Sequence, residues 1–254
     1  MALGDFDGDN QPELLMSSMH NKYMQNVWAG DKPKRDVHWL EKNKFFDALT
    51  FYTLRNSGNE TIAMTNYNYK IVGDEYKCLQ AAQVVTGDLN GDGIDDVAIG
   101  CHGYDKKPWP GGPQAILLSR GNKVFEVKEV ISKRTFVNSV VMIDADRDGD
   151  LDIIYGAKNK KILLIRNEGK GNFSSPSTLF NNYMARRMDA IDLNGDGFDD
   201  LIVAGREDKN EPTVIFWSDT SGKFTKKNSL KLKPVNGFPK PKAFFEDENY
   251  LFIS

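Results

Sequence analysis

Residues 88–96 read DLNGDGIDD, and residues 192–200 read DLNGDGFDD. Two further stretches follow nearly the same pattern, DADRDGDLD at residues 144–152 and DFDGDNQPE at residues 5–13. The common form is D-x-[DN]-x-D-G-x-x-[DE], which offers side-chain oxygen at positions 1, 3, 5 and 9. Because an internal repeat of this kind governs the architecture, we treat each copy as the centre of one structural repeat.

Short apolar segments that read as β-strands lie on both sides of these stretches. QVVTGD precedes Asp88 and DVAIG follows the loop, whereas VVMID and DIIYG flank the loop at Asp144. Short runs that are rich in β-branched residues and end at glycine are typical of strands. An EF-hand begins similarly, but it needs flanking helices and an acidic residue at position 12. That position holds Ile99, Tyr155 or Val203, so we predict a loop between two antiparallel strands.

The spacing of the oxygens predicts a calcium site in the loops. Ca²⁺ takes about six to eight hard oxygen ligands, and the backbone carbonyl at position 7 can add one. A simple Asp-Gly turn is the alternative, but it needs no set of carboxylates, which repel one another unless a cation neutralises them. We expect three to four Ca²⁺ ions, held by Asp5, Asp7, Asp9, Gln11 and Glu13; Asp88, Asn90, Asp92, Ile94 and Asp96; Asp144, Asp146, Asp148, Asp150 and Asp152; and Asp192, Asn194, Asp196, Phe198 and Asp200.

A fifth copy keeps the hydrophobic frame of the repeat but lacks the ligands. Thr53 and Arg55 occupy positions 1 and 3 of this copy, so we expect a strand pair without an ion. Segments that follow the loops, such as KKILLIRNEGKGNFSSPS, add a third strand, a glycine turn and a fourth strand. Repeats of four antiparallel strands predict an all-β fold, a β-propeller with five clear blades and a partial sixth. Within one domain over residues 1–254, the expected blades are 1–42, 43–80, 81–133, 134–182, 183–236 and, in part, 237–254.

The loop pattern, followed by ILLIRNEGKGNF, resembles the FG-GAP and VCBS repeats of integrin alpha-subunit propellers, secreted microbial proteins and some fungal lectins. The resemblance implies a β-propeller, usually of seven blades, with calcium between the first and second strands of a blade. At the first copy Asn10 replaces the glycine and Glu13 the last aspartate, which implies a looser site there. The tail PKAFFEDENYLFIS reads as part of an unfinished blade, so we expect either closure onto the first blade or, preferably, a longer chain and a larger ring.

Composition argues against several classes of protein. The net charge of −3 speaks against a nucleic-acid partner. No apolar stretch approaches the ~20 residues that a transmembrane helix needs, and the first residues carry no secretory signal, as expected for a mature form or a fragment. Cys78 and Cys101 permit one disulfide without requiring it.

The residue pattern does not predict an enzyme. His20, His38 and His102 share no spacing, and we expect His102 to be exposed. The loop carboxylates would be engaged with ions rather than placed across a cleft, as glycosidases require. Trp28, Trp39 and Trp217 fall in expected strands and read as core residues.

Chain direction places the loops between second and third strands on the face opposite the calcium loops. The longest of them is CHGYDKKPWPGG at residues 101–112, and such loops often carry function. The candidate ligand-binding residues are Tyr104, Trp109, Arg186 and Arg187, with Lys133, Arg134 and Tyr183 on the same face. We expect a non-enzymatic, extracellular or cell-surface adhesion or scaffold module whose partner is a protein or a glycan. The alternatives are a lectin of the same fold and an accessory propeller of a secreted polysaccharide-degrading enzyme.

Overall fold

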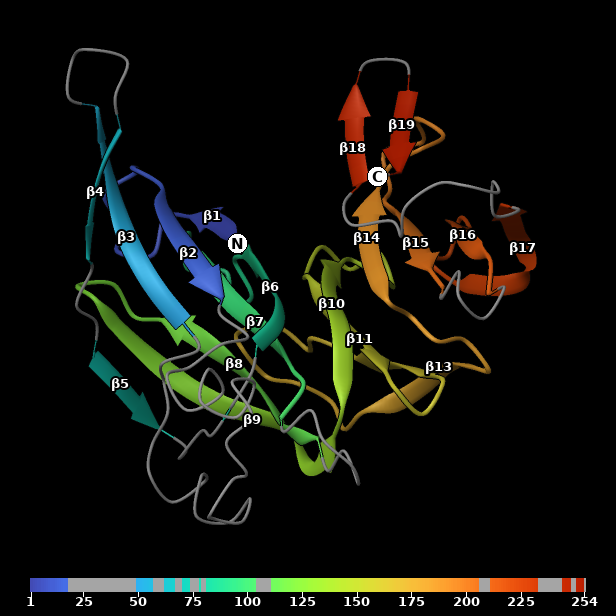
Figure 1. The fold of residues 1–254 in the computed structure, drawn as a ribbon, viewed down its shortest axis with the longest axis horizontal. Coiled ribbons are helices and arrows are strands. Elements are labelled where there is room, and N and C mark those ends of the chain that lie inside the picture. The colour runs from blue at the N-terminus through green and yellow to red at the C-terminus, as the bar shows by residue number, and fades with distance from the viewer. Residues whose placement is uncertain are drawn as a thin grey trace, which may run out of the picture.

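The computed structural model describes residues 1–17, 49–56, 62–66, 70–73, 78, 81–103, 111–205, 211–232, 244–247 and 250–253. Its regular elements are strands, and no helix occurs in these residues (Figure 1). Accordingly, none of them forms a helix that is long and apolar enough to cross a membrane. For the part of the chain that the structure describes, the prediction of an all-β fold is therefore confirmed.

Three antiparallel sheets each contain four strands in chain order, as expected for blades. Their strands are β6 (Ala81–Gly87), β7 (Asp96–Cys101), β8 (Gly112–Ser119) and β9 (Val124–Thr135); β10 (Val137–Ile143), β11 (Asp152–Ala157), β12 (Lys161–Ile165) and β13 (Ser177–Asn181); and β14 (Arg187–Ile191), β15 (Asp200–Ala204), β16 (Thr213–Ser218) and β17 (Phe224–Leu232). A short strand, β5 (Lys70–Gly73), adds to β9 in the parallel direction. These sheets match three of the expected repeats closely.

The first sheet corrects the expected boundary between residues 42 and 43. It runs in the order β1 (Ala2–Gly4), β2 (Glu13–Ser17), β3 (Leu49–Asn56) and β4 (Ile62–Asn66). Residues 49–66 are thus the third and fourth strands of the first sheet, not the first pair of a separate blade. Thr53 and Arg55 lie within β3, and Asn56 pairs with Ile62. The alternation of apolar residues is similar in every strand of such a sheet, so the sequence pattern did not reveal the place of residues 49–66 in the sheet.

Consecutive sheets meet through their first strands. β1 contacts β6, β6 contacts β10, and β10 contacts β14, so these strands lie along the inner side of the array (Figure 1). The remaining strands of each sheet follow outward in order. β18 (Phe244–Asp247) and β19 (Tyr250–Ile253) form a further hairpin, as the tail of the sequence predicted.

The hydrophobic core lies between the sheets rather than within any one of them. One cluster joins the first and second sheets through Phe6, Leu15 and Phe125. A second cluster joins the sheet β6–β9 to the sheet β10–β13. A third cluster joins the sheet β10–β13 to the sheet β14–β17, and in it the rings of Phe180 and Phe216 stack with centroids 4.1 Å apart. Central strands such as β7, β11 and β15 are buried at every residue, which explains why they read as continuous apolar runs.

Cys78 and Cys101 form a disulfide, with their Cα atoms 5.7 Å apart. Cys101 ends β7, so the bond attaches the chain just before β6 to the neighbouring strand. The sequence had left this pairing open.

Candidate metal-binding loops

The four acidic stretches form similar loops between the first and second strands of the four sheets. We name them loop 5 (residues 5–13), loop 88 (88–96), loop 144 (144–152) and loop 192 (192–200). Positions 4 and 6 of every loop adopt positive φ, a conformation that favours glycine. The pairs are Gly8 and Asn10 (80° and 62°), Gly91 and Gly93 (76° and 82°), Arg147 and Gly149 (63° and 95°), and Gly195 and Gly197 (73° and 85°). The sequence had indicated position 6 alone.

The first aspartate of each loop accepts hydrogen bonds from amides of its own loop. In loop 88, Asp88 Oδ1 accepts from Gly91 N at 2.7 Å and Oδ2 accepts from Gly93 N at 2.8 Å. The carboxylates of Asp5, Asp144 and Asp192 accept the position 6 amide in the same way. Such donors favour the charged form, and the amide of Gly197 contributes most to the lowered pKa of Asp192. In loop 192, the loop's own amides therefore favour the anionic form of the first aspartate.

Carboxylate oxygens converge in loops 5 and 144. In each loop, three of them lie within 4.8 Å of one another: Asp5, Asp7 and Glu13 in loop 5, and Asp144, Asp146 and Asp148 in loop 144. Buried oxygens of Asp7 (Oδ1), Glu13 (Oε1) and Asp146 (Oδ1) accept no hydrogen bond from the described residues. Buried anionic oxygens that face each other without donors are unfavourable, so the arrangement fits a cation.

Loops 88 and 192 place asparagine at position 3 instead of a third clustered carboxylate. Asn90 Nδ2 lies 3.4 and 3.2 Å from the two oxygens of Asp96, to which it donates, and this leaves its carbonyl oxygen for another contact. At position 5, Asp92 Oδ1 accepts from the amide of Ile94 at 3.0 Å. The same bond from position 7 to position 5 recurs in the other three loops. All four loops are therefore closed by one set of hydrogen bonds.

The last carboxylate of loops 88, 144 and 192 connects the loop to the third strand of its sheet as well as facing the loop. Glu13, Asp96, Asp152 and Asp200 are all 0% exposed. Asp96 accepts from Leu89 N in the loop at 2.8 Å and from Ser119 N at the end of β8 at 2.7 Å. Asp152 and Asp200 accept the corresponding amides of the loop and of a residue at, or just after, the end of the third strand. In these three loops, position 9 thus connects the loop, the second strand and the end of the third strand, a role that the sequence did not indicate.

Burial changes the protonation of these last carboxylates. Loss of solvent raises the pKa of Glu13, Asp96 and Asp152 to about 7, and neighbouring carboxylates of the same loops add to the rise. Burial also raises the pKa of Asp200. A bound cation would favour the charged form and oppose this effect.

An arginine lies beside the carboxylates of loop 144. Arg166 Nη1 pairs with Asp146 Oδ2 and lies 3.9 Å from Asp152 Oδ2. Because Ile153 pairs with Ile165, Arg166 occupies the register position opposite Asp152. The aligned residue in the second sheet is Leu118, opposite Asp96. Loop 144 therefore has an extra carboxylate at position 3 and an arginine that compensates its charge.

Side chains at the ends of the third strands tie neighbouring loops together. Ser119 Oγ donates to the carbonyl oxygen of Phe6 in loop 5 at 2.6 Å. Asn167 Nδ2 donates to the carbonyl oxygen of Leu89 in loop 88 at 2.7 Å. Sequence reasoning missed these bonds, although a polar residue at the end of each third strand was a visible signal.

Of the candidates on the opposite face, Tyr104 and Trp109 lie outside the described residues, as do Trp28, Trp39, His20 and His38. Arg186 is exposed, and Arg187 is half-buried in the first strand of its sheet. The ring of Tyr183 packs edge-on against Phe180 and Phe216, with centroids 5.8 and 5.3 Å away. Lys133 and Arg134 are exposed.

Two other expectations about single residues need correction. His102 is 8% exposed rather than free in solvent, its Nε2 lies 3.1 Å from Asn138 Oδ1, and its ring packs on Phe136. Trp217 lies in β16 as expected, but it is half-buried rather than a core residue. It follows Phe216, which pairs with Leu201, and therefore stands opposite Asp200.

Comparison with known families agrees with this geometry. The FG-GAP-like repeat family model matches residues 88–155 and 144–203, two overlapping segments that contain loops 88, 144 and 192. Residues 88–203 therefore carry FG-GAP-like repeats, which supports the resemblance to the FG-GAP and VCBS repeats. No match to a curated protein was found.

Proposed function

We propose that this protein is an extracellular, calcium-stabilised β-propeller module that acts in adhesion or scaffolding. The four-stranded sheets with adjoining first strands are compatible with blades of a propeller, and the hairpin β18–β19 would belong to a further blade. An adhesion or scaffold role needs no catalytic group, and the loop carboxylates would instead hold the ions of the loops.

The observation that carries the proposal is the set of unpartnered buried oxygens in loops of one repeated geometry. Asp7, Glu13 and Asp146 each bury an oxygen that accepts no hydrogen bond from the described residues. Ca²⁺ prefers such oxygen ligands and tolerates irregular coordination. The residues present thus fit the ion, which would be held at positions 1, 3, 5, 7 and 9 of each loop.

Calcium would stabilise the fold because each loop joins several strands. Asp96 already connects loop 88 to β7 and β8, so an ion at this loop would fix three strands together. The bonds of Ser119 and Asn167 to the preceding loops would extend that order from sheet to sheet. An ion that binds only the folded loop shifts unfolding by mass action.

An extracellular location is supported by the disulfide between Cys78 and Cys101, since such bonds persist in oxidising compartments. Calcium concentrations outside cells also suit sites of moderate affinity, as extracellular modules use. The partner would be a protein or a glycan on the face opposite the loops, where Lys133, Arg134 and Arg186 are exposed.

A glycan-binding role is the second candidate, favoured by a cavity of about 270 Å³ on the last sheet. Asn182, Tyr183, Glu211 and Lys226 line it. Glu211 Oε2 is buried and accepts no hydrogen bond from the described residues. A cavity that combines polar side chains with an aromatic ring suits a sugar. Binding to a glycan array that is lost in Glu211→Gln would favour this function over scaffolding.

The experiment that tests the calcium proposal is thermal unfolding in millimolar calcium and in excess EDTA, with bound ions counted by native mass spectrometry. We expect three or four ions and a clear rise in Tm with calcium. Asp88→Asn and Asp192→Asn should each remove one ion, whereas Asp219→Asn, in a turn outside the loops, should remove none. An unchanged Tm and no bound ion would show that the loops are only turns.

A further inference from the structure

Position 4 of the repeated loop differs in one copy. Gly8, Gly91 and Gly195 occupy it in loops 5, 88 and 192, whereas loop 144 has Arg147. Arg147 has a φ of 63°, a backbone conformation that L-residues with a side chain adopt at an energetic cost. Such strain at a position where glycine would serve points to a use for the side chain.

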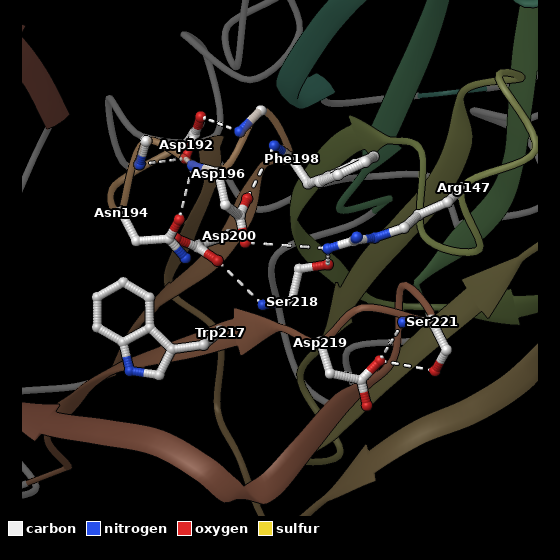
Figure 2. Close-up of polar contacts among 12 residues, drawn as sticks. Arg147, Asp192, Asn194, Asp196, Phe198, Asp200, Trp217, Ser218, Asp219 and Ser221 are labelled. Carbon is white, nitrogen blue, oxygen red and sulfur yellow. Dashed lines mark hydrogen bonds and ion pairs between the residues drawn. The ribbon is translucent and has the colours of Figure 1, made fainter.

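The side chain of Arg147 reaches across to loop 192 (Figure 2). Its guanidinium carbon lies 3.3 Å from the centroid of the Phe198 ring. Its Nη2 donates to Ser218 Oγ at 3.3 Å and lies 4.0 Å from Asp196 Oδ2. The side chain is only 14% exposed, so it is held between the two loops rather than free in solvent.

Each residue that Arg147 contacts supports one ligand position of loop 192. Asp196 is position 5, and Phe198 supplies the carbonyl of position 7. The amide of Ser218 donates to Asp200 Oδ1, position 9, at 2.9 Å. The guanidinium group of Arg147 therefore contacts the residues at positions 5 and 7 of loop 192 and, through Ser218, the residue that holds position 9.

We propose that Arg147 is a positioning residue through which an ion in loop 144 prepares loop 192 for its own ion. This inference rests on the calcium binding proposed above. Arg147 stands between Asp146 and Asp148, so a cation on these carboxylates fixes the backbone from which its side chain extends. A fixed guanidinium then holds Phe198 and Asp196 in place, and by linkage the ion in loop 192 favours the ion in loop 144 equally.

The neighbouring loops lack this connection. At loop 5, a Cβ built on Gly8 would lie 3.2 Å from Ile94 Cδ1 of loop 88, so loop 88 fills the space itself. Gly91 of loop 88 has no heavy atom within 4 Å of such a Cβ. Coupling through position 4 is therefore confined to loops 144 and 192, which gives an internal comparison.

Terbium luminescence can report loop 192 separately. Tb³⁺ replaces Ca²⁺ at oxygen sites and emits when a nearby tryptophan transfers energy to it. Trp217 stands opposite Asp200 in the register of β15 and β16, and Figure 2 shows its indole on the same side of the loop as Asn194. The part of the emission that Trp217→Phe removes is the signal of loop 192.

The titration compares wild type, Asp144→Asn, Arg147→Gly and the double variant. Asp144→Asn should weaken terbium binding at loop 192 about five-fold, within the usual range of site-to-site coupling. Arg147→Gly should weaken it similarly, and Asp144→Asn should then add no further loss. Lys160→Gly is the matched control, because Lys160 is also a cation at positive φ (64°) but lies in the turn between β11 and β12.

The outcomes separate this inference from the calcium proposal. If Asp144→Asn leaves loop 192 unchanged, or weakens it equally with and without Arg147, coupling through Arg147 is wrong while calcium binding stands. If wild type gives no emission that depends on Trp217 and no bound ion by mass spectrometry, the calcium proposal fails and this inference fails with it.

Discussion

Replacing Arg166 by leucine should destabilise the calcium-free protein while increasing its response to calcium. Arg166 pairs with Asp146 and lies 3.9 Å from an oxygen of Asp152, which is 0% exposed. Leucine is the residue at the same register in the second sheet, where Leu118 stands opposite Asp96. The substitution therefore fits the strand and removes the compensating charge.

The magnitude follows from the exposure of the pair. Arg166 and Asp146 are 39% and 31% exposed, so solvent screens their attraction and limits it to about 1 kcal/mol. Without the arginine, the carboxylates of Asp146 and Asp152 also repel each other, which brings the total loss of unfolding free energy to about 1–2 kcal/mol. For a chain of this size, that loss lowers Tm by about 2–8 °C.

A second substitution makes the test specific. Asp146→Asn together with Arg166→Leu reproduces the arrangement of loop 88, where Asn90 donates to Asp96. In EDTA the double variant should recover most of the lost Tm. Because Arg166→Leu alone removes a positive charge beside the ion, its rise in Tm with calcium should exceed that of wild type.

Thermal unfolding in EDTA and in calcium measures both effects. Arg120→Leu is the matched control, since Arg120 pairs with Glu126 in the turn between β8 and β9 and contacts no loop carboxylate. The reasoning would be refuted if Arg166→Leu left the Tm in EDTA unchanged, or if the double variant were as unstable as the single one.

Two further predictions concern pH and the disulfide. Burial raises the pKa of Glu13, Asp96 and Asp152 to about 7, so in EDTA the folded protein holds protons that the unfolded chain releases above pH ~4. Without calcium, the free energy of unfolding should therefore fall as pH rises from about 4 through 7, and calcium should make this fall smaller. Denaturant unfolding at pH 5 and pH 8, in EDTA and in calcium, measures the difference. An equal fall in both conditions would contradict the prediction. Replacing Cys78 and Cys101 by serine should cost about 3 kcal/mol, as expected for a bond that closes a separation of 23 residues, and an unchanged unfolding midpoint under non-reducing conditions would argue against the bond.

Local pattern predicted the loops and the strands beside them. DLNGDGIDD lies between β6 and β7 as expected, because apolar runs on both sides and glycine at the ends specify an antiparallel pair. The same signals located three of the four-stranded sheets within a few residues. These elements depend on contacts between residues close in the chain, which a sequence pattern records.

The order of strands in the first sheet could not be read from the sequence in this way. Residues 49–66 match the hydrophobic frame of a first strand pair, yet β3 pairs with β2, and Glu13 stands opposite Thr53. The inner strands of such a sheet have a strand on each side, so their apolar patterns are alike. The pairing is determined by contacts between segments that lie far apart in the sequence.

The hydrogen bonds that hold the residues of the candidate loops in place likewise form only when the sheets are assembled. The sequence names Asp96 as a ligand, but its bond to Ser119 appears only when β8 lies beside β7. Asn167 reaches Leu89 across 78 residues, and Arg147 reaches Ser218 across 71. Residue types show where carboxylate and amide oxygens cluster, whereas the groups that hold those oxygens in position come from the adjacent strand of the same sheet or from a neighbouring sheet.

The four loops share one backbone conformation but differ in the charge of their side chains. Loops 88 and 192 have asparagine at position 3, and loop 144 has Asp146 with Arg166 beside it, so all three place similar net charge around an ion. Loop 5 combines Asp7 with Glu13, so its positions 1, 3, 5 and 9 all carry carboxylates. Loop 5 therefore has the strongest electrostatic need for a cation, although Asn10 replaces its glycine. The oxygens Asp7 Oδ1 and Glu13 Oε1 agree with that conclusion, since neither accepts a hydrogen bond from the described residues.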